Sequence, residues 1–140
     1  AVLGVSLPIG SLTLYIRFVD GILPSRGEVR KIEAEAAAQI ESARLRIRSG
    51  AAKQIVAVGG TARAALKLRN SLEGKSGNSA YEISFYAPER IHTITPGIAV
   101  LHTVAKTFGC RTVVTSPYGV REGYLYYLLK ERGILHGKQP

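Results

Sequence analysis

The stretch Gln54-Ile-Val-Ala-Val-Gly-Gly-Thr-Ala-Arg63 constrains the fold most. Its apolar run, residues 55–58, predicts a strand covered on both faces, as in a parallel or mixed α/β sheet. Gly59 and Gly60 end that strand, and we expect Thr61 to cap the helix that follows. Helix N–H groups then face the carboxyl edge of the sheet, where such folds usually bind anions or other ligands. The same glycines also suit a turn that binds nothing and only lets a helix pack closely against a strand.

The chain before this stretch predicts one strand and one long helix. Residues 12–19 alternate apolar and polar side chains, which predicts a half-buried strand with Tyr15 and Arg17 on its solvated face. Apolar residues then recur at spacings of three and four, which predicts a helix from Ser25 or Arg26 to Ser49. The residues expected on its buried face are Ile32, Ala36, Ile40, Ala43 and Ile47.

The chain after this stretch predicts two helices around another covered strand. Proline after Thr95 indicates a helix start, and Gly109 indicates its end. Residues 111–116 predict the strand, and residues 120–132 predict a final helix closed by Gly133. The apolar stripe expected to be buried on the first of these helices consists of Ile98, Leu101, Val104 or Ala105, and Phe108.

Strands that alternate with helices predict an α/β fold with a mostly parallel sheet. We expect one domain over residues 1–135 and a disordered tail over residues 136–140. Residues 81–86 fit either a short strand or an extended connection. The sequence starts at Ala1 and has no methionine, so we expect it to be a fragment of a larger protein.

The charge of the chain favours anionic partners. The formal net charge is +9, which suits polyphosphate, nucleotides or nucleic acid, and also suits a basic surface with no dedicated partner. No apolar run is long enough to span a bilayer, and no signal peptide is recognised. Cys110 is the only cysteine, which excludes an intrachain disulfide and agrees with a reducing, cytoplasmic location.

The sequence does not display a complete active site. The histidines lack the spacing of a helical metal pair, and we expect no metal ligands in this chain. Gly74-Lys75-Ser76 lacks the leading glycine of a phosphate-binding P-loop and is rejected as one. Glu122 follows Arg121 at a helix start, and we expect this pair to hold the turn rather than to catalyse.

Four stretches together resemble the exopolyphosphatase/guanosine pentaphosphate phosphatase family. They are Ser6-Leu-Pro-Ile-Gly-Ser-Leu12, Val58-Gly-Gly-Thr-Ala-Arg63, Glu89-Arg-Ile-His-Thr-Ile-Thr-Pro-Gly97 and Ser116-Pro-Tyr-Gly-Val-Arg-Glu-Gly123. Their order and approximate spacing match the second half of that family's core. The resemblance implies one ribonuclease H-like lobe of an actin/Hsp70/sugar-kinase type fold.

By resemblance, the parent protein hydrolyses the terminal phosphoryl group of polyphosphate or guanosine pentaphosphate, with Mg²⁺ or another divalent cation assisting. In the family, two glycine-rich phosphate loops and a water-activating glutamate precede the part that this chain resembles. The resemblance therefore implies a missing N-terminal lobe as partner, no catalytic residue in this chain, and little activity of the chain alone. It leaves open a homodimer, and it implies no membrane and no nucleic-acid partner.

The resemblance assigns candidate substrate-binding positions residue by residue. Gly59, Gly60 and Thr61 match the glycine turn on the cleft side, and Arg90 matches an arginine near the cleft. Structural or secondary roles fall to Arg63, Arg121 and Glu122. The chain departs from the family at His92, where an aspartate is common, and in a shorter segment over residues 72–81.

Other functions stay open from the sequence. The chain also fits the nucleotide-binding lobe of another actin-like ATPase or kinase, a basic nucleic-acid-binding module, or a regulatory lobe that senses guanosine tetraphosphate. Exposed aromatic and basic platforms of the type used by RNA-recognition motifs are not evident, which counts against the nucleic-acid alternative.

Overall fold

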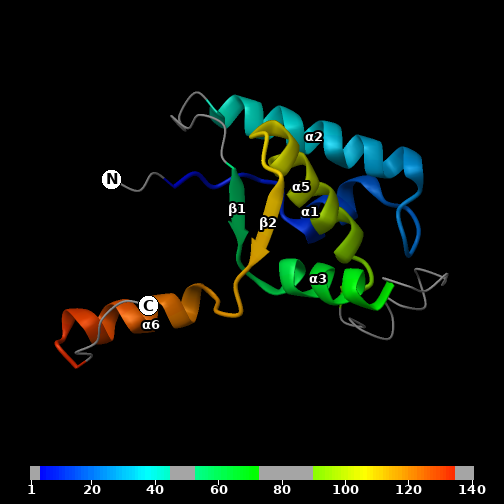
Figure 1. Ribbon diagram of the computed structural model, residues 1–140. Coiled ribbons are helices and arrows are strands. Elements are labelled where there is room, and N and C mark those ends of the chain that lie inside the picture. Colours follow the sequence, from blue (N-terminus) through cyan, green and yellow to red (C-terminus); the bar gives the residue numbers. More distant parts are fainter. Residues whose placement is uncertain (1–3, 45–52, 73–89, 135–140) are drawn as a thin grey trace.

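The computed structural model describes residues 4–44, 53–72 and 90–134 (Figure 1). Helices α1 and α2 come first, and a strand–helix–helix–strand–helix sequence follows. The bounds are α1 Ser11–Phe18, α2 Arg26–Arg44, β1 Gln54–Ala57, α3 Gly60–Leu72, α5 Ile94–Thr107, β2 Thr112–Thr115 and α6 Val120–Glu131. The predictions for residues 45–50, 74–76, 81–86 and 136–140 lie outside the described residues.

The two strands form a parallel pair. Gln54 lies opposite Thr112 and Ala57 lies opposite Thr115. Both strands occur where the sequence predicts them, and the fold is α/β as expected at that coarse level. The finer assignment to a ribonuclease H-like lobe stays a prediction. Within the described ranges, no helix is both long enough and apolar enough to cross a lipid bilayer.

Helix α5 lies at the centre of the helical layer and packs against α1, α2 and α3 (Figure 1). On α2 the expected buried positions Ile32, Ala36, Ile40 and Ala43 are confirmed. On α5 the expected stripe is only partly correct, because Ile98 is 36% exposed and its other members are half-buried, whereas Ala99 is 5% and Thr103 6% exposed. Ala99 and Thr103 are small, so neighbouring helices can approach α5 closely on the face that carries them. Close packing on this face contributes more than burial of the larger side chain of Ile98 would.

The predicted strand at residues 12–19 is wrong, because this segment forms helix α1. Leu14 is fully buried and packs with Ile32 and Ala99, and Phe18 packs against the same cluster one turn later. Leu12 and Ile16, which the alternating pattern placed on the same face, are 57% and 73% exposed. Packing against α2 and α5 therefore selects the four-residue spacing over the two-residue spacing.

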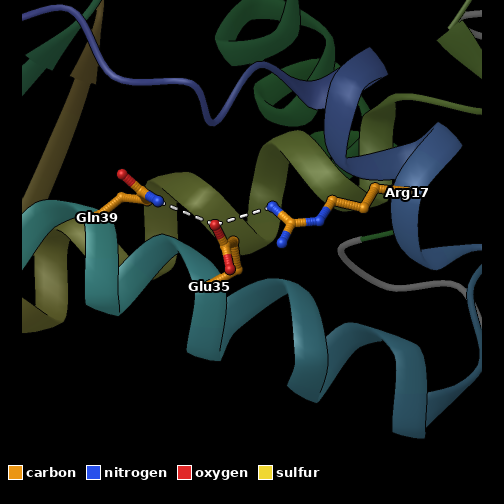
Figure 2. A network of polar contacts seen from close by, with 3 residues as sticks. All are labelled: Arg17, Glu35 and Gln39. Atoms are coloured by element: carbon orange, nitrogen blue, oxygen red, sulfur yellow. Dashed lines mark hydrogen bonds and ion pairs between the residues drawn. The ribbon is translucent and has the colours of Figure 1, made fainter.

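The two polar side chains singled out on this segment stabilise its helical packing. Tyr15 donates its hydroxyl to the carbonyl oxygen of Gly21 at 2.6 Å. Arg17 donates from Nη1 to Oε1 of Glu35 on α2 at 3.0 Å, and the same oxygen accepts from Nε2 of Gln39 at 3.0 Å (Figure 2). Because of these contacts, chiefly the Gln39 hydrogen bond, the pKa of Glu35 lies below its ordinary value. Arg17 thus joins two helices instead of lining a sheet.

The prediction that both strands are covered is wrong for part of the sheet. Ile55 is half-buried and Ala57 is buried, but Val56 is 59% exposed and its partner Val114 is 41% exposed. Val113 and Thr115 line a shallow apolar groove with residues of α3 and α5. In the described part of the chain the helices therefore cover the sheet incompletely.

Candidate functional site

The carboxyl ends of both strands lead directly into helix N-termini. β1 ends at Ala57 and is followed by the glycine turn and α3, and β2 ends at Thr115 and is followed by α6. The backbone N–H of Ser116 donates to the carbonyl oxygen of Ala57 at 3.1 Å, which holds the two strand ends together. Because the strands are parallel, both chain reversals lie at the same edge of the sheet, called here the carboxyl edge.

The glycine turn has a backbone that requires glycine at its first position. Gly59 has φ of +115°, a value that other residues rarely adopt, and its carbonyl oxygen accepts the N–H of Arg63 at 3.3 Å. Helix α3 begins at Gly60, so Gly59 occupies the capping position. The N–H groups of the first turn have no carbonyl partners within the helix and point toward the carboxyl edge.

Thr61 does not cap α3, which corrects the expectation from the sequence. It lies inside the first turn, and its methyl group packs against the α-carbon of Gly97 at the start of α5. A β-carbon at Gly97 would collide with that methyl group. The side chain of Thr61 therefore lies at the contact between two helix N-termini.

Arg90 lies against the glycine turn, although 30 residues separate it from Gly60 in the sequence. A β-carbon on Gly60 would lie 2.6 Å from Cζ and 3.1 Å from Nη1 of Arg90. Only glycine at this position leaves room for the guanidinium group where it now sits. The carbonyl oxygen of Arg90 accepts the N–H of Thr93 at 2.9 Å, which fixes the backbone of Arg90 at the entry to α5.

Arg63 brings a second guanidinium group to the first turn of α3. Its Nη1 atom is buried and has no hydrogen-bond partner among the residues that the structure describes. A buried donor without a partner costs about 1–3 kcal/mol, so this atom favours an acceptor such as a phosphate oxygen. The resemblance assigned Arg63 only a secondary role. Its place in the sequence, three residues after Gly60, was the one indication that it could contribute to phosphate binding.

Glu122 stabilises the start of α6. Its Oε2 atom accepts the backbone N–H of Gly119 at 2.8 Å, as in half of a capping box. Backbone N–H groups of Glu122 itself and of Gly119, and then the charges of Arg121 and Arg63, lower the pKa of Glu122 below its ordinary value. Glu122 therefore stays ionised and engaged in the turn. The influence of Arg63 also shows that the start of α6 lies within electrostatic reach of the first turn of α3.

Metal-ligating side chains do not gather in a large cluster among the described residues. Within the described ranges, no group of three or more histidine, cysteine, aspartate or glutamate side chains could hold a metal ion. His102 pairs with Glu33 at 3.0 Å, away from the carboxyl edge, and both belong to the helical layer. The carboxyl edge thus offers positive charge and N–H donors. This combination is chemically suited to an anion.

Comparison with known proteins leaves the family unassigned. None of the protein-family models, curated proteins and solved structures with which the chain was compared gives a match. The resemblance to the exopolyphosphatase/guanosine pentaphosphate phosphatase family therefore stays a prediction.

Proposed function

We propose that the carboxyl edge binds phosphate groups and forms one wall of the cleft of a phosphohydrolase. The substrate class is inorganic polyphosphate or guanosine pentaphosphate, and the reaction of the parent protein is release of the terminal phosphate to water. The observation that carries the proposal is the guanidinium group of Arg90 seated on Gly60 at the N-terminus of α3.

This arrangement combines two physical means of holding phosphate. The N–H groups and dipole of a helix N-terminus favour an anion. A guanidinium group adds paired donors in a geometry that matches phosphate oxygens. Arg63, in the first turn of α3, adds a buried Nη1 donor that has no partner among the described residues. The net charge of +9 raises the local concentration of any polyanion.

In this proposal the chain positions the substrate, and the groups that act on the attacking water belong to another lobe of the parent protein. Phosphoryl transfer depends mainly on positioning and on neutralisation of charge, which is the part that these arginines supply. The divalent cation expected to assist the parent protein is not assigned to residues of this chain. We expect the 140-residue chain alone to release no phosphate from polyphosphate, even with Mg²⁺ present. Release above that of a heat-denatured sample would contradict this division of roles.

The proposed site is tested by comparing Arg90→Ala with Arg111→Ala. Both changes remove one positive charge, but Arg111 is exposed and precedes β2 at the opposite edge of the sheet. Isothermal titration with tripolyphosphate measures binding. We expect Arg90→Ala to weaken binding by roughly 1.5–3 kcal/mol, about 10- to 150-fold, because a charge-assisted contact is lost. Arg111→Ala changes only the net charge and is expected to weaken binding about twofold or less.

Equal losses in the two variants would show that binding follows net charge and would refute the site. The same titrations with ATP and with a short single-stranded DNA separate the alternatives. Tighter binding of ATP than of tripolyphosphate would favour a nucleotide lobe. A steep loss of DNA affinity with salt, without preference for tripolyphosphate, would favour a nucleic-acid module.

A further inference from the structure

Among the described residues, nothing buries the large apolar and aromatic side chains of helix α6. No residue of α6 is buried, and its large side chains stand in solvent, with exposed fractions of 62% for Tyr124, 57% for Leu125 and 47% for Tyr126. Figure 1 shows α6 extending away from the layer formed by α2, α5 and α3. A helix that is apolar around its circumference is normally buried in a core or an interface.

One side of α6 forms a shallow hollow with the spacing of a helix-packing seam. Glu122, Leu125, Tyr126 and Leu129 line it, together with Tyr118 and Gly123. The first four recur at spacings of three and four, so they share one face of the helix. A β-carbon at Gly123 would meet nothing within 4 Å. Contacts with the described part of the chain therefore give no reason for glycine there, whereas close approach of a second helix does.

The charges of α6 favour a second copy of the same helix as the occupant. α6 carries Arg121 and Lys130 against Glu122 and Glu131, so its net charge is zero in a chain of net charge +9. Two copies of this helix can therefore meet without net repulsion between them. When two copies of α6 run antiparallel and cross at Tyr126, Glu122 of each lies opposite Lys130 of the other. The same register places the small Gly123 opposite the large Leu129.

We propose that α6 pairs with α6 of a second copy, antiparallel, across a two-fold axis that passes near Tyr126. Leu125, Tyr126 and Leu129 form the apolar seam, and a Glu122–Lys130 ion pair closes each end. Within one helix these two residues lie about 12 Å apart along the axis, so only a second copy brings them together. Since one helix pair is a small interface, we expect reversible association with Kd on the order of 10–100 µM.

Disulfide trapping at the proposed axis tests the arrangement. In a Cys110→Ser background of the 140-residue chain, Tyr126→Cys and Tyr124→Cys each introduce a single thiol in place of an exposed tyrosine. Residue 126 meets its own copy at the axis, whereas the side chain of residue 124 projects about 160° away around the helix. We expect mild oxidation to give a covalent dimer with Cys at 126 and at least about tenfold less with Cys at 124, because a disulfide requires close α-carbons.

Sedimentation velocity over a range of concentrations supplies the second measurement. Lys130→Glu places like charges opposite each other at both ends, so we expect about tenfold weaker association, while circular dichroism verifies that the variant is folded. A chain that stays monomeric at several hundred micromolar, equal trapping at 124 and 126, or unchanged association of Lys130→Glu would overturn the proposal. If α6 instead packs against a different lobe of the parent protein, the 140-residue chain is expected to stay monomeric.

Discussion

Replacing Gly60 with alanine separates the binding role of the carboxyl edge from its stability. The new β-carbon would lie 2.6 Å from Cζ of Arg90, where an ordinary contact needs at least 3.4 Å. The guanidinium group therefore has to move by about 1 Å, which exceeds the tolerance of a hydrogen-bonded phosphate contact. It can move, because it is the far end of a flexible side chain.

The two consequences of Gly60→Ala have opposite signs. Folding should be unaffected or slightly more favourable, since alanine in a helix is more stable than glycine by up to about 0.5–1 kcal/mol. Binding of tripolyphosphate should weaken nearly as much as in Arg90→Ala, about 10- to 150-fold. Thermal melts and isothermal titration on the same samples measure both quantities.

A double variant and a matched glycine complete this test. In an Arg90→Ala background, Gly60→Ala should have no further effect on binding, because the displaced group is already absent. Gly27→Ala is the control, because Gly27 lies in the first turn of α2. Its new β-carbon would lie 4.0 Å from Oγ of Ser25, an ordinary contact that displaces no side chain. Wild-type affinity of Gly60→Ala, or additive losses in the double variant, would refute the reasoning.

Three further predictions concern stability. Gly59→Ala should destabilise the chain by roughly 1–3 kcal/mol in urea unfolding, because φ of +115° strains any side chain; an unchanged midpoint would contradict this. Ile32→Ala, at a fully buried position, should cost about 2–5 kcal/mol, whereas Leu12→Ala at a 57% exposed position should cost far less. Contacts with Ser25 and then Asp20 lower the pKa of Glu28 to about 2, below the ordinary 4.5, so its stabilising contribution is complete above pH 4.5 and is lost as pH falls toward 2. In an acid titration followed by circular dichroism, Glu28→Gln should lose stability less steeply across that interval, and identical slopes would count against the assignment.

Glycines that end helices, and the spacing of apolar residues along the long helix, made much of the fold predictable. Gly109 and Gly133 end helices with φ of +66° and +65°, as expected for glycine after a helix. The start of α2 was also readable, since Ser25 and Glu28 form a reciprocal capping box with hydrogen bonds of 2.6 and 3.3 Å. Local chemistry decides these features, so the sequence contains them.

Features that depend on distant partners were not predictable. In α1, the positions of Leu14 and Phe18 satisfy a period of two and a spacing of four equally well. The packing of Leu14 against Ile32 and Ala99 selects the helix over the strand. On α5 the choice of buried face likewise depends on which neighbours can approach its small side chains.

The candidate site was predictable in its composition more than in its geometry. The glycine turn can be predicted from the local sequence pattern. The contact of the Arg90 guanidinium group with Gly60 cannot, because it joins residues that are far apart in the sequence. Thr61 was given a capping role because threonine is common there, whereas the observed contact with Gly97 depends on the approach of α5. The partnerless Nη1 atom of Arg63 is visible only in three dimensions.

The most direct test of the phosphate site is to map tripolyphosphate onto the backbone amides of the ¹⁵N-labelled chain by nuclear magnetic resonance. The account predicts the largest shifts at residues 59–63, with a second group at Arg90 and the start of α5. It also predicts small shifts at Lys53 and Arg111, which precede the two strands at the other edge of the sheet. Shifts centred on that other edge, or spread evenly over the basic residues, would contradict the account.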